Sequence, residues 1–231
     1  MAENVIVIEP HETMTAAAKS LVENAPHGPK IYTRHGDKGS SIQIDGTKLS
    51  KSDPQIAAVG SLDAAQSWLG VVIAELSDAC TELHEPLIAL QQKFYQVQSD
   101  VAVPGCEFID DDDTDTLEKE IDGFMRRVET IPAFVLPGGS PTGARLHYAR
   151  TLARAAERAC VAFSEAKPGR VRPEDLKFVN RLSDYLFAMA RYANHLDGIR
   201  EAIARKPRWR TTVTHPGLDG TCEAIDRKPQ N

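Results

Sequence analysis

Residues 175–196 read DLKFVNRLSDYLFAMARYANHL, and this stretch decides the fold. Apolar residues recur in it every three or four positions, a spacing typical of one face of an α-helix. We expect this helix to run from about Pro173 to Arg205. A polar cluster interrupts the apolar pattern, and it either forms a buried hydrogen-bond network or faces a ligand. Its members are Asn180, Arg181, Ser183 and Asp184.

Helical periodicity continues toward the N-terminus and predicts four more helices. They cover about Ser52–Leu76, Ala79–Val103, Asp115–Val128 and Thr142–Ala166. Strands and helices do not alternate, so the sequence predicts an all-α protein, a five-helix up-and-down bundle. We interpret residues 1–29 as an extension, 30–205 as the bundle with a leading loop, and 206–231 as a tail. Within the loop, SIQIDG (residues 41–46) predicts a brief strand or hairpin.

Composition excludes several classes of protein. The 231 residues carry a net charge of −6, which argues against nucleic-acid binding. The four cysteines form no CxxC or Cys/His cluster, so we expect free thiols and no zinc site. We see no apolar run near the ~20 residues that a membrane span needs and no targeting peptide, which predicts a cytoplasmic protein. The acidic run 110–113 is interpreted as a solvated loop that caps the next helix.

Two stretches suit an anionic ligand. Arg150, Arg154 and Arg158 recur every four residues, with Glu157 beside them, so three guanidinium groups share one side of a helix. Such a stripe binds phosphates or acidic partners, or it is a solvated face paired with surface glutamates. Residues 30–41, KIYTRHGDKGSS, suit a loop that wraps a phosphate, although its glycines could also simply make turns.

Six blocks carry a resemblance to a known family. They are IYTRHGDKGSS, SKSDP, VGSLD, FVLPGGS, ARTLARAAER and FVNRLSDYLFAMARYANHL. In order and spacing they resemble the PduO-type ATP:cob(I)alamin adenosyltransferases over residues 30–197. The resemblance implies a ferritin-like, cobalamin adenosyltransferase-like five-helix bundle with an N-terminal loop that wraps ATP. It also implies a homotrimer whose active sites lie between subunits. The implied reaction transfers the 5′-deoxyadenosyl group of ATP to the cobalt of cob(I)alamin and releases triphosphate.

The resemblance also assigns roles to residues. The positions that match ATP contacts are Thr33, Arg34, His35, Gly36, Ser41, Lys51, Arg154, Glu157, Arg158 and Asn180. Catalytic roles are implied for Arg154, for Asp63 and Arg150 as a salt bridge across the subunit boundary, and for Phe134. Phe134 and Phe187 are implied to contact the corrinoid, with Phe134 displacing its lower ligand. Mg²⁺ would bridge the ATP phosphates without a dedicated protein ligand.

The chain departs from the family at several positions. Ala64 stands where the family usually has Glu, Gln66 where it has Asn, and Ala155 where it has a second Arg, while His35 replaces a small polar residue. These departures put the catalytic rate in question more than ATP binding. One alternative is a weakly catalytic carrier of ATP or adenosylcobalamin for a cobalamin-dependent enzyme. In a second alternative, the protein has a structural role and the arginines of the stripe only form ion pairs within the trimer. A reductase that supplies cob(I)alamin is a possible partner. His147 and His195 are interpreted as structural.

Overall fold

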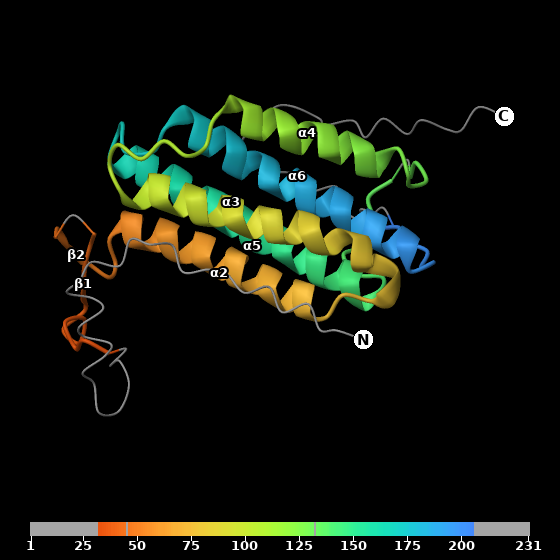
Figure 1. Ribbon diagram of the computed structural model, residues 1–231, viewed down its shortest axis with the longest axis horizontal. Coiled ribbons are helices and arrows are strands. Elements are labelled where there is room, and N and C mark those ends of the chain that lie inside the picture. The colour runs from red at the N-terminus through yellow and green to blue at the C-terminus, as the bar shows by residue number, and fades with distance from the viewer. Residues whose placement is uncertain (1–31, 45, 132, 206–231) are drawn as a thin grey trace, which may run out of the picture.

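The computed structural model describes residues 32–44, 46–131 and 133–205. Within them the predicted all-α bundle of five helices is confirmed (Figure 1). The elements are β1 (Ser40–Ile42), β2 (Lys48–Ser50), α2 (Pro54–Ala74), the 3₁₀ helix η1 (Asp78–Leu83), α3 (His84–Ala102), α4 (Asp111–Met125), α5 (Pro141–Ala166) and α6 (Pro173–Leu196). The proposed extension 1–29 and tail 206–231 lie outside the described residues, which begin at Tyr32 in the leading loop.

The helices lie side by side, and α6 is the most buried of them. It packs against α5 and α4, while α2 packs against α5 and α3. Its inward face includes Phe178, Leu182, Leu186 and Met189, all with no exposed surface, so the apolar spacing in the sequence does mark the core. β1 and β2 pair antiparallel beside the start of α2, which confirms the hairpin alternative for residues 41–46.

The predicted C-terminal boundary of the last helix is wrong. We expected the helix to reach Arg205, but α6 ends at Leu196. Gly198 follows at φ 66°, the left-handed conformation that commonly terminates helices. The chain then turns back, and Ile203 forms an isolated antiparallel bridge with Val135. Residues 199–205 therefore brace the loop before α5 instead of extending the helix.

Two N-terminal boundaries also differ from the prediction. The segment expected as one helix from Ala79 is a 3₁₀ helix followed by α3. α4 begins at Asp111, four residues earlier than expected, so most of the acidic run is helical. Asp110 caps it by accepting from the backbone N–H of Asp113 at 3.0 Å, and acidic residues in a first turn favour the helix dipole. The predicted capping role is confirmed, but the predicted loop is wrong.

α2 is more apolar than expected. Among the described residues, it alone is long and apolar enough to cross a membrane by length and composition, whereas we expected no such run. One face packs Ala58, Leu62 and Leu69 into the bundle core, as a core helix does. Its other side still presents apolar groups such as Val71, which is 38% exposed.

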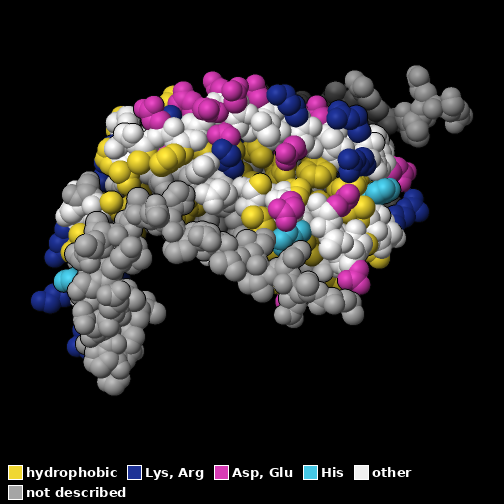
Figure 2. All heavy atoms as spheres, viewed as in Figure 1, with side chains coloured by type: hydrophobic (Ala, Val, Ile, Leu, Met, Phe, Trp, Pro, Cys, Tyr) yellow, Lys and Arg dark blue, Asp and Glu magenta, His cyan; other side chains and the backbone are white. Residues whose placement is uncertain are grey.

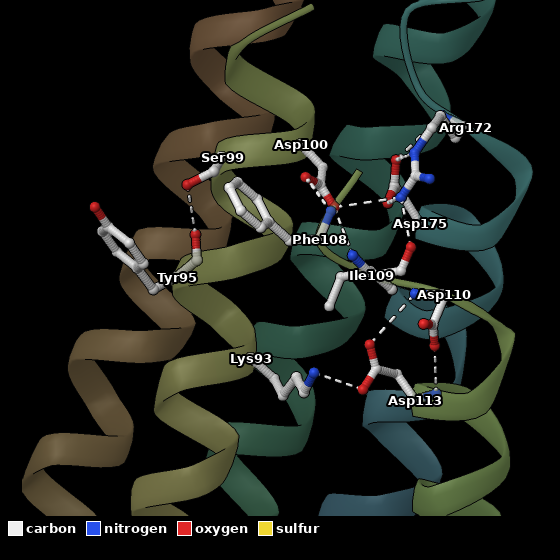
Figure 3. A network of polar contacts seen from close by, with 10 residues as sticks. All are labelled: Lys93, Tyr95, Ser99, Asp100, Phe108, Ile109, Asp110, Asp113, Arg172 and Asp175. Atoms are coloured by element: carbon white, nitrogen blue, oxygen red, sulfur yellow. Dashed lines mark hydrogen bonds and ion pairs between the residues drawn. The ribbon is translucent and has the colours of Figure 1, made fainter. Parts of the chain in front are cut away.

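A buried ionic network fixes one end of the bundle (Figure 3). Asp100 of α3 accepts from the backbone N–H groups of Phe108 and Ile109 at 2.9 Å. Arg172, which precedes α6, lies 3.3 Å from Asp100 and 2.9 Å from Asp175. Both carboxylates are buried, so their charges depend on this single guanidinium.

Arg172→Met should lower the free energy of unfolding by about 3–5 kcal/mol, because it leaves two buried carboxylates without a cation. Urea denaturation measures the change. Lys177→Met is the matched control, since it removes an exposed pair with Asp111 and should change stability by less than about 1 kcal/mol. Equal effects of the two substitutions would contradict the role given to Arg172.

A second ion pair joins the start of α2 to the end of α5. Asp53 caps α2 through the N–H of Gln55 at 2.9 Å, and Lys167 Nζ lies 2.9 and 3.0 Å from its two carboxylate oxygens. The hydrogen bond from Lys167, followed by that from Gln55, lowers the pKa of Asp53. A lowered pKa in the folded state means that the ionised carboxylate stabilises the fold.

Asp53→Asn keeps a capping side chain and removes the charge. At pH 7 it should reduce the free energy of unfolding by about 1–2 kcal/mol. The stabilisation is present above the unfolded pKa, near 4, and is lost as pH falls through the lower folded pKa. The difference from wild type should therefore shrink below about pH 4. A difference that stays constant from pH 7 to pH 2.5 would show that charge is not the cause.

Candidate functional site

A cavity of about 520 Å³ lies where α5 and α6 meet the end of α4 and the loop before α5. Its lining combines apolar and basic side chains: Met125, Ile131, Ala133, Phe134, Val135, Pro137, His147, Arg150, Phe187 and Arg191. The structure thus brings together Phe134, Phe187 and Arg150, three residues that the sequence assigned to the corrinoid site or to catalysis. A flat, largely apolar ligand with polar groups at its rim would suit such a lining.

The returning C-terminal segment positions Phe134. Leu136 donates its backbone N–H to Ala202 at 2.7 Å, and Ala204 donates to the carbonyl of Phe134 at 2.7 Å. The side chain of Phe134 is left 87% exposed at the cavity. Phe134 therefore presents a large aromatic surface to the cavity that no other described residue covers.

The arginine stripe of α5 extends from this cavity to a polar group formed by Arg154, Glu157 and Asn180. Arg150 lines the cavity, and its Nε is buried without a hydrogen-bond partner in the described part of the chain. One turn further, Arg154 Nη1 lies 3.8 Å from Glu157, which also accepts from Asn180 Nδ2 of α6 at 2.8 Å. Glu157 therefore joins two predicted nucleotide contacts, and Asn180 faces α5 at the surface instead of entering a buried network.

These contacts bear on the alternative of a solvated basic face. Arg154 does pair with a neighbouring glutamate, as that alternative expects. Arg150 does not, because no ion pair of this residue occurs among the described residues. Arg158 is exposed one turn beyond Arg154. Arg154 and Arg158 therefore fit the interpretation as a solvated basic face. Arg150, at the cavity, does not.

The leading loop lies beside the start of α2 (Figure 1). The start of α2 meets the end of α5 through Asp53 and Lys167, whereas Phe134 precedes the start of α5. Thr33, Arg34 and His35 are exposed, and Ser41 of β1 pairs with Leu49 of β2. Arg34 has a φ of 62°, a left-handed conformation that is uncommon for residues other than glycine. Its guanidinium lies 5.3 Å from the centre of the Tyr32 ring. The loop is thus held in a defined shape that presents basic and hydroxyl groups to solvent.

The two glycines of the loop have different roles. Gly39 has a φ of 78°, which only glycine adopts readily, so it makes a turn. Gly36 does not, but a Cβ there would lie 3.1 Å from Lys51 Nζ. Its missing side chain therefore makes room for the lysine predicted to bind phosphate. Lys51 also donates its backbone N–H to Gly39 at 2.9 Å, which closes the loop.

The predicted nucleotide contacts form two groups within one chain. The loop residues and Lys51 are one group, and Arg154, Glu157 and Asn180 are the other. No hydrogen bond or ion pair joins the two groups across the described residues. Asp63 is exposed on α2, and it makes no ion pair with Arg150 within the described chain.

Sequence reasoning missed two polar residues of the cavity lining. His147, interpreted as structural, is 2% exposed, lines the cavity and has no partner for either ring nitrogen among the described residues. Burial, and then the charge of Arg150, lowers its pKa, so its imidazole is neutral at pH 7. Arg191 is the other, and its Nε donates to Glu201 at 2.8 Å. The sequence did hold a signal for both residues. His147 is three residues from Arg150 and Arg191 four from Phe187, so each shares a helix face with a predicted site residue.

Gln66 accounts for one departure from the family pattern. Its Nε2 donates to the carbonyl of Gln91 at 2.8 Å, and its Oε1 accepts from Gln98 at 2.7 Å. Both partners belong to α3, so the side chain joins α2 to α3. The longer amide is used for packing and does not enter the arginine stripe.

Comparisons with known proteins agree with this arrangement. A family model described as cobalamin adenosyltransferase matches residues 31–193. A corrinoid adenosyltransferase from Mycobacterium leprae is 36% identical over 180 residues, which cover 74% of this chain and 94% of that protein. The corrinoid adenosyltransferase PduO from Salmonella typhimurium is 38% identical over 186 residues, or 76% of this chain and 54% of that protein.

Solved structures are similar over the same region. A variant PduO-type ATP:corrinoid adenosyltransferase from Lactobacillus reuteri, complexed with cobalamin and ATP, superposes with a TM-score of 0.74. It is 36% identical, and the match covers 77% of this chain and all of that one. A second variant from the same organism, complexed with ATP, gives a TM-score of 0.72 at 36% identity. Family, sequence and fold agree, and the chain belongs to the cobalamin adenosyltransferase family.

Proposed function

We propose that this protein transfers the 5′-deoxyadenosyl group of ATP to the cobalt of cob(I)alamin and releases triphosphate. The observation that carries the proposal is the stripe on α5, where Arg150 lines the cavity and Arg154 joins Glu157 and Asn180 one turn away. One helical turn rises about 5.4 Å, so a corrinoid in the cavity and a nucleotide beside Arg154 would be neighbours. The L. reuteri relatives, solved with cobalamin and ATP, support this assignment.

The reaction requires little covalent chemistry from the protein. The cobalt(I) centre attacks C5′ of ATP, a Co–C bond forms, the C5′–O bond breaks, and triphosphate leaves with the electron pair. Arg154 would stabilise the charge that develops on the leaving oxygens, and Lys51 would bind the phosphates. Mg²⁺ would neutralise the phosphates, and no cluster of three metal-ligating side chains occurs among the described residues. Phe134 would cover the lower face of the corrinoid and keep a cobalt ligand away.

We propose that the site forms between subunits of a homotrimer. No hydrogen bond or ion pair joins the loop and Lys51 to the group of Arg154, Glu157 and Asn180 within the described chain, so we infer that the two groups meet between subunits. The outward side of α2 is made mostly of small and apolar residues, and Asp63 on it makes no ion pair among the described residues. A second copy packed on α2 would cover this surface and bring its own Arg150 to Asp63. The same proposal places the protein in the cytoplasm. It includes two partners, a reductase that supplies cob(I)alamin and an enzyme that accepts the product.

The test of function is adenosylation of chemically reduced cobalamin by the purified protein with ATP and Mg²⁺, followed as loss of the cobalt(I) absorbance. Arg154→Ala should lower kcat/KM by about 100-fold or more, because it removes a cation from the leaving group. Arg126→Ala is the control, since Arg126 is exposed at the end of α4 and makes no described ion pair. Wild-type protein that binds ATP without turnover would favour the carrier alternative.

Assembly is tested by sedimentation equilibrium, which should give the mass of a trimer. Asp63→Arg places like charges together at the proposed boundary, and we expect it to raise the dissociation constant of the trimer at least about tenfold. Asp122→Arg, an exposed change on α4, should leave the trimer intact. A wild-type monomer at micromolar concentration would contradict the shared site.

A further inference from the structure

His147 lies buried at the cavity without a hydrogen-bond partner. It is 2% exposed, and neither Nδ1 nor Nε2 has a partner in the described part of the chain. The ring packs edge-to-face on Phe187, with 5.9 Å between ring centres. Phe187 is itself part of the cavity lining. A buried polar group left unpaired destabilises a folded protein, so this histidine needs an explanation other than core packing.

The surroundings keep His147 neutral and leave its nitrogens unused. The charged groups near it are Arg150 on α5, Arg191 on α6 and Glu201 on the returning segment. Arg191 donates to Glu201 Oε2 and to the carbonyl of Glu129, and Glu201 Oε1 is left unpaired among the described residues, but neither side chain hydrogen-bonds the histidine. A neutral imidazole has one N–H donor and one acceptor nitrogen. It suits a ligand that presents both kinds of group, which a bare anion does not.

A corrinoid presents both kinds of group. Primary amide side chains project from the rim of its ring, and each has N–H donors and a carbonyl acceptor. The ring would lie in the apolar part of the cavity, between Phe134 and Phe187. His147 lies on the same face of α5 as Arg150, one turn further from the nucleotide group, where a rim amide of a ring seated in the cavity would lie.

We propose that His147 is a positioning residue for the corrinoid, and that its imidazole hydrogen-bonds amide side chains at the rim of the ring in the cavity. The inference rests on the proposed function and adds a contact that the sequence comparison did not assign. It explains why the unpaired imidazole is kept: it destabilises the free protein and is satisfied when the corrinoid binds.

The decisive variants are His147→Leu and His147→Gln. His147→Leu removes both unpaired nitrogens at similar volume, so the free protein should unfold at a higher temperature. The same variant should raise KM for cob(I)alamin about tenfold, the equivalent of one lost hydrogen bond, with kcat and the Kd for ATP near wild type. His147→Gln restores a donor and an acceptor and should recover part of the KM. His84→Leu, an exposed histidine at the start of α3, is the matched control.

A structural role for His147 predicts the opposite signs. His147→Leu would then unfold at a lower temperature and leave KM unchanged, and either result overturns the proposal. Equilibrium binding of cob(II)alamin to ATP-loaded protein provides an independent readout. If the wild type shows no turnover, the proposed function fails. The contact of His147 is then still decided by whether His147→Leu weakens cob(II)alamin binding.

Discussion

The arrangement of the site depends on close packing between the first turn of α5 and the end of α6. Asn194, near the end of α6, accepts from the N–H of Ser140 at 2.9 Å and donates to the carbonyl of Gly138 at 3.1 Å. A Cβ at Gly139 or Gly143 would collide with the Asn194 side chain. Gly139 in the PGGS turn and Gly143 in the first turn of α5 are therefore steric requirements of this contact, and a side chain at either position would displace the helix.

This contact sets the register of α5 along α6, and the register sets the chemistry. The helices are antiparallel, so moving from Asn194 toward the start of α6 means moving from the start of α5 toward its end. His147 then meets Phe187, and Glu157 meets Asn180. A shift of one residue would rotate Arg150 away from the cavity by about 100°. The aromatic cavity and the arginine stripe both follow from this contact between α5 and α6. Along α5 they run from apolar residues at the cavity to charged residues beyond it.

The sequence predicted what local periodicity encodes and missed what depends on distant contacts. The core face of α6 follows from Phe178, Leu182 and Leu186, which recur at helical spacing. The end of α6 was wrong because the pattern of residues 197–205 says nothing about their pairing with the loop at Phe134. His147 was missed for a related reason. A histidine on an apolar face is usually satisfied, and only the folded structure reveals that neither nitrogen finds a partner.

Buried polar groups are compensated to different degrees along the bundle. Where α3, α4 and α6 meet, Asp100 receives two backbone N–H groups and a guanidinium, so its charge is compensated within the chain. Figure 2 shows Lys, Arg, Asp and Glu side chains mixed along one face of the molecule. At the cavity, His147 and Arg150 keep buried polar atoms unpaired among the described residues, and Thr114 and Arg170 do so near the Asp100 network. The cavity differs in that its unpaired side chains line a space of about 520 Å³, where the proposed ligand would reach them, whereas those at the other end do not line this cavity.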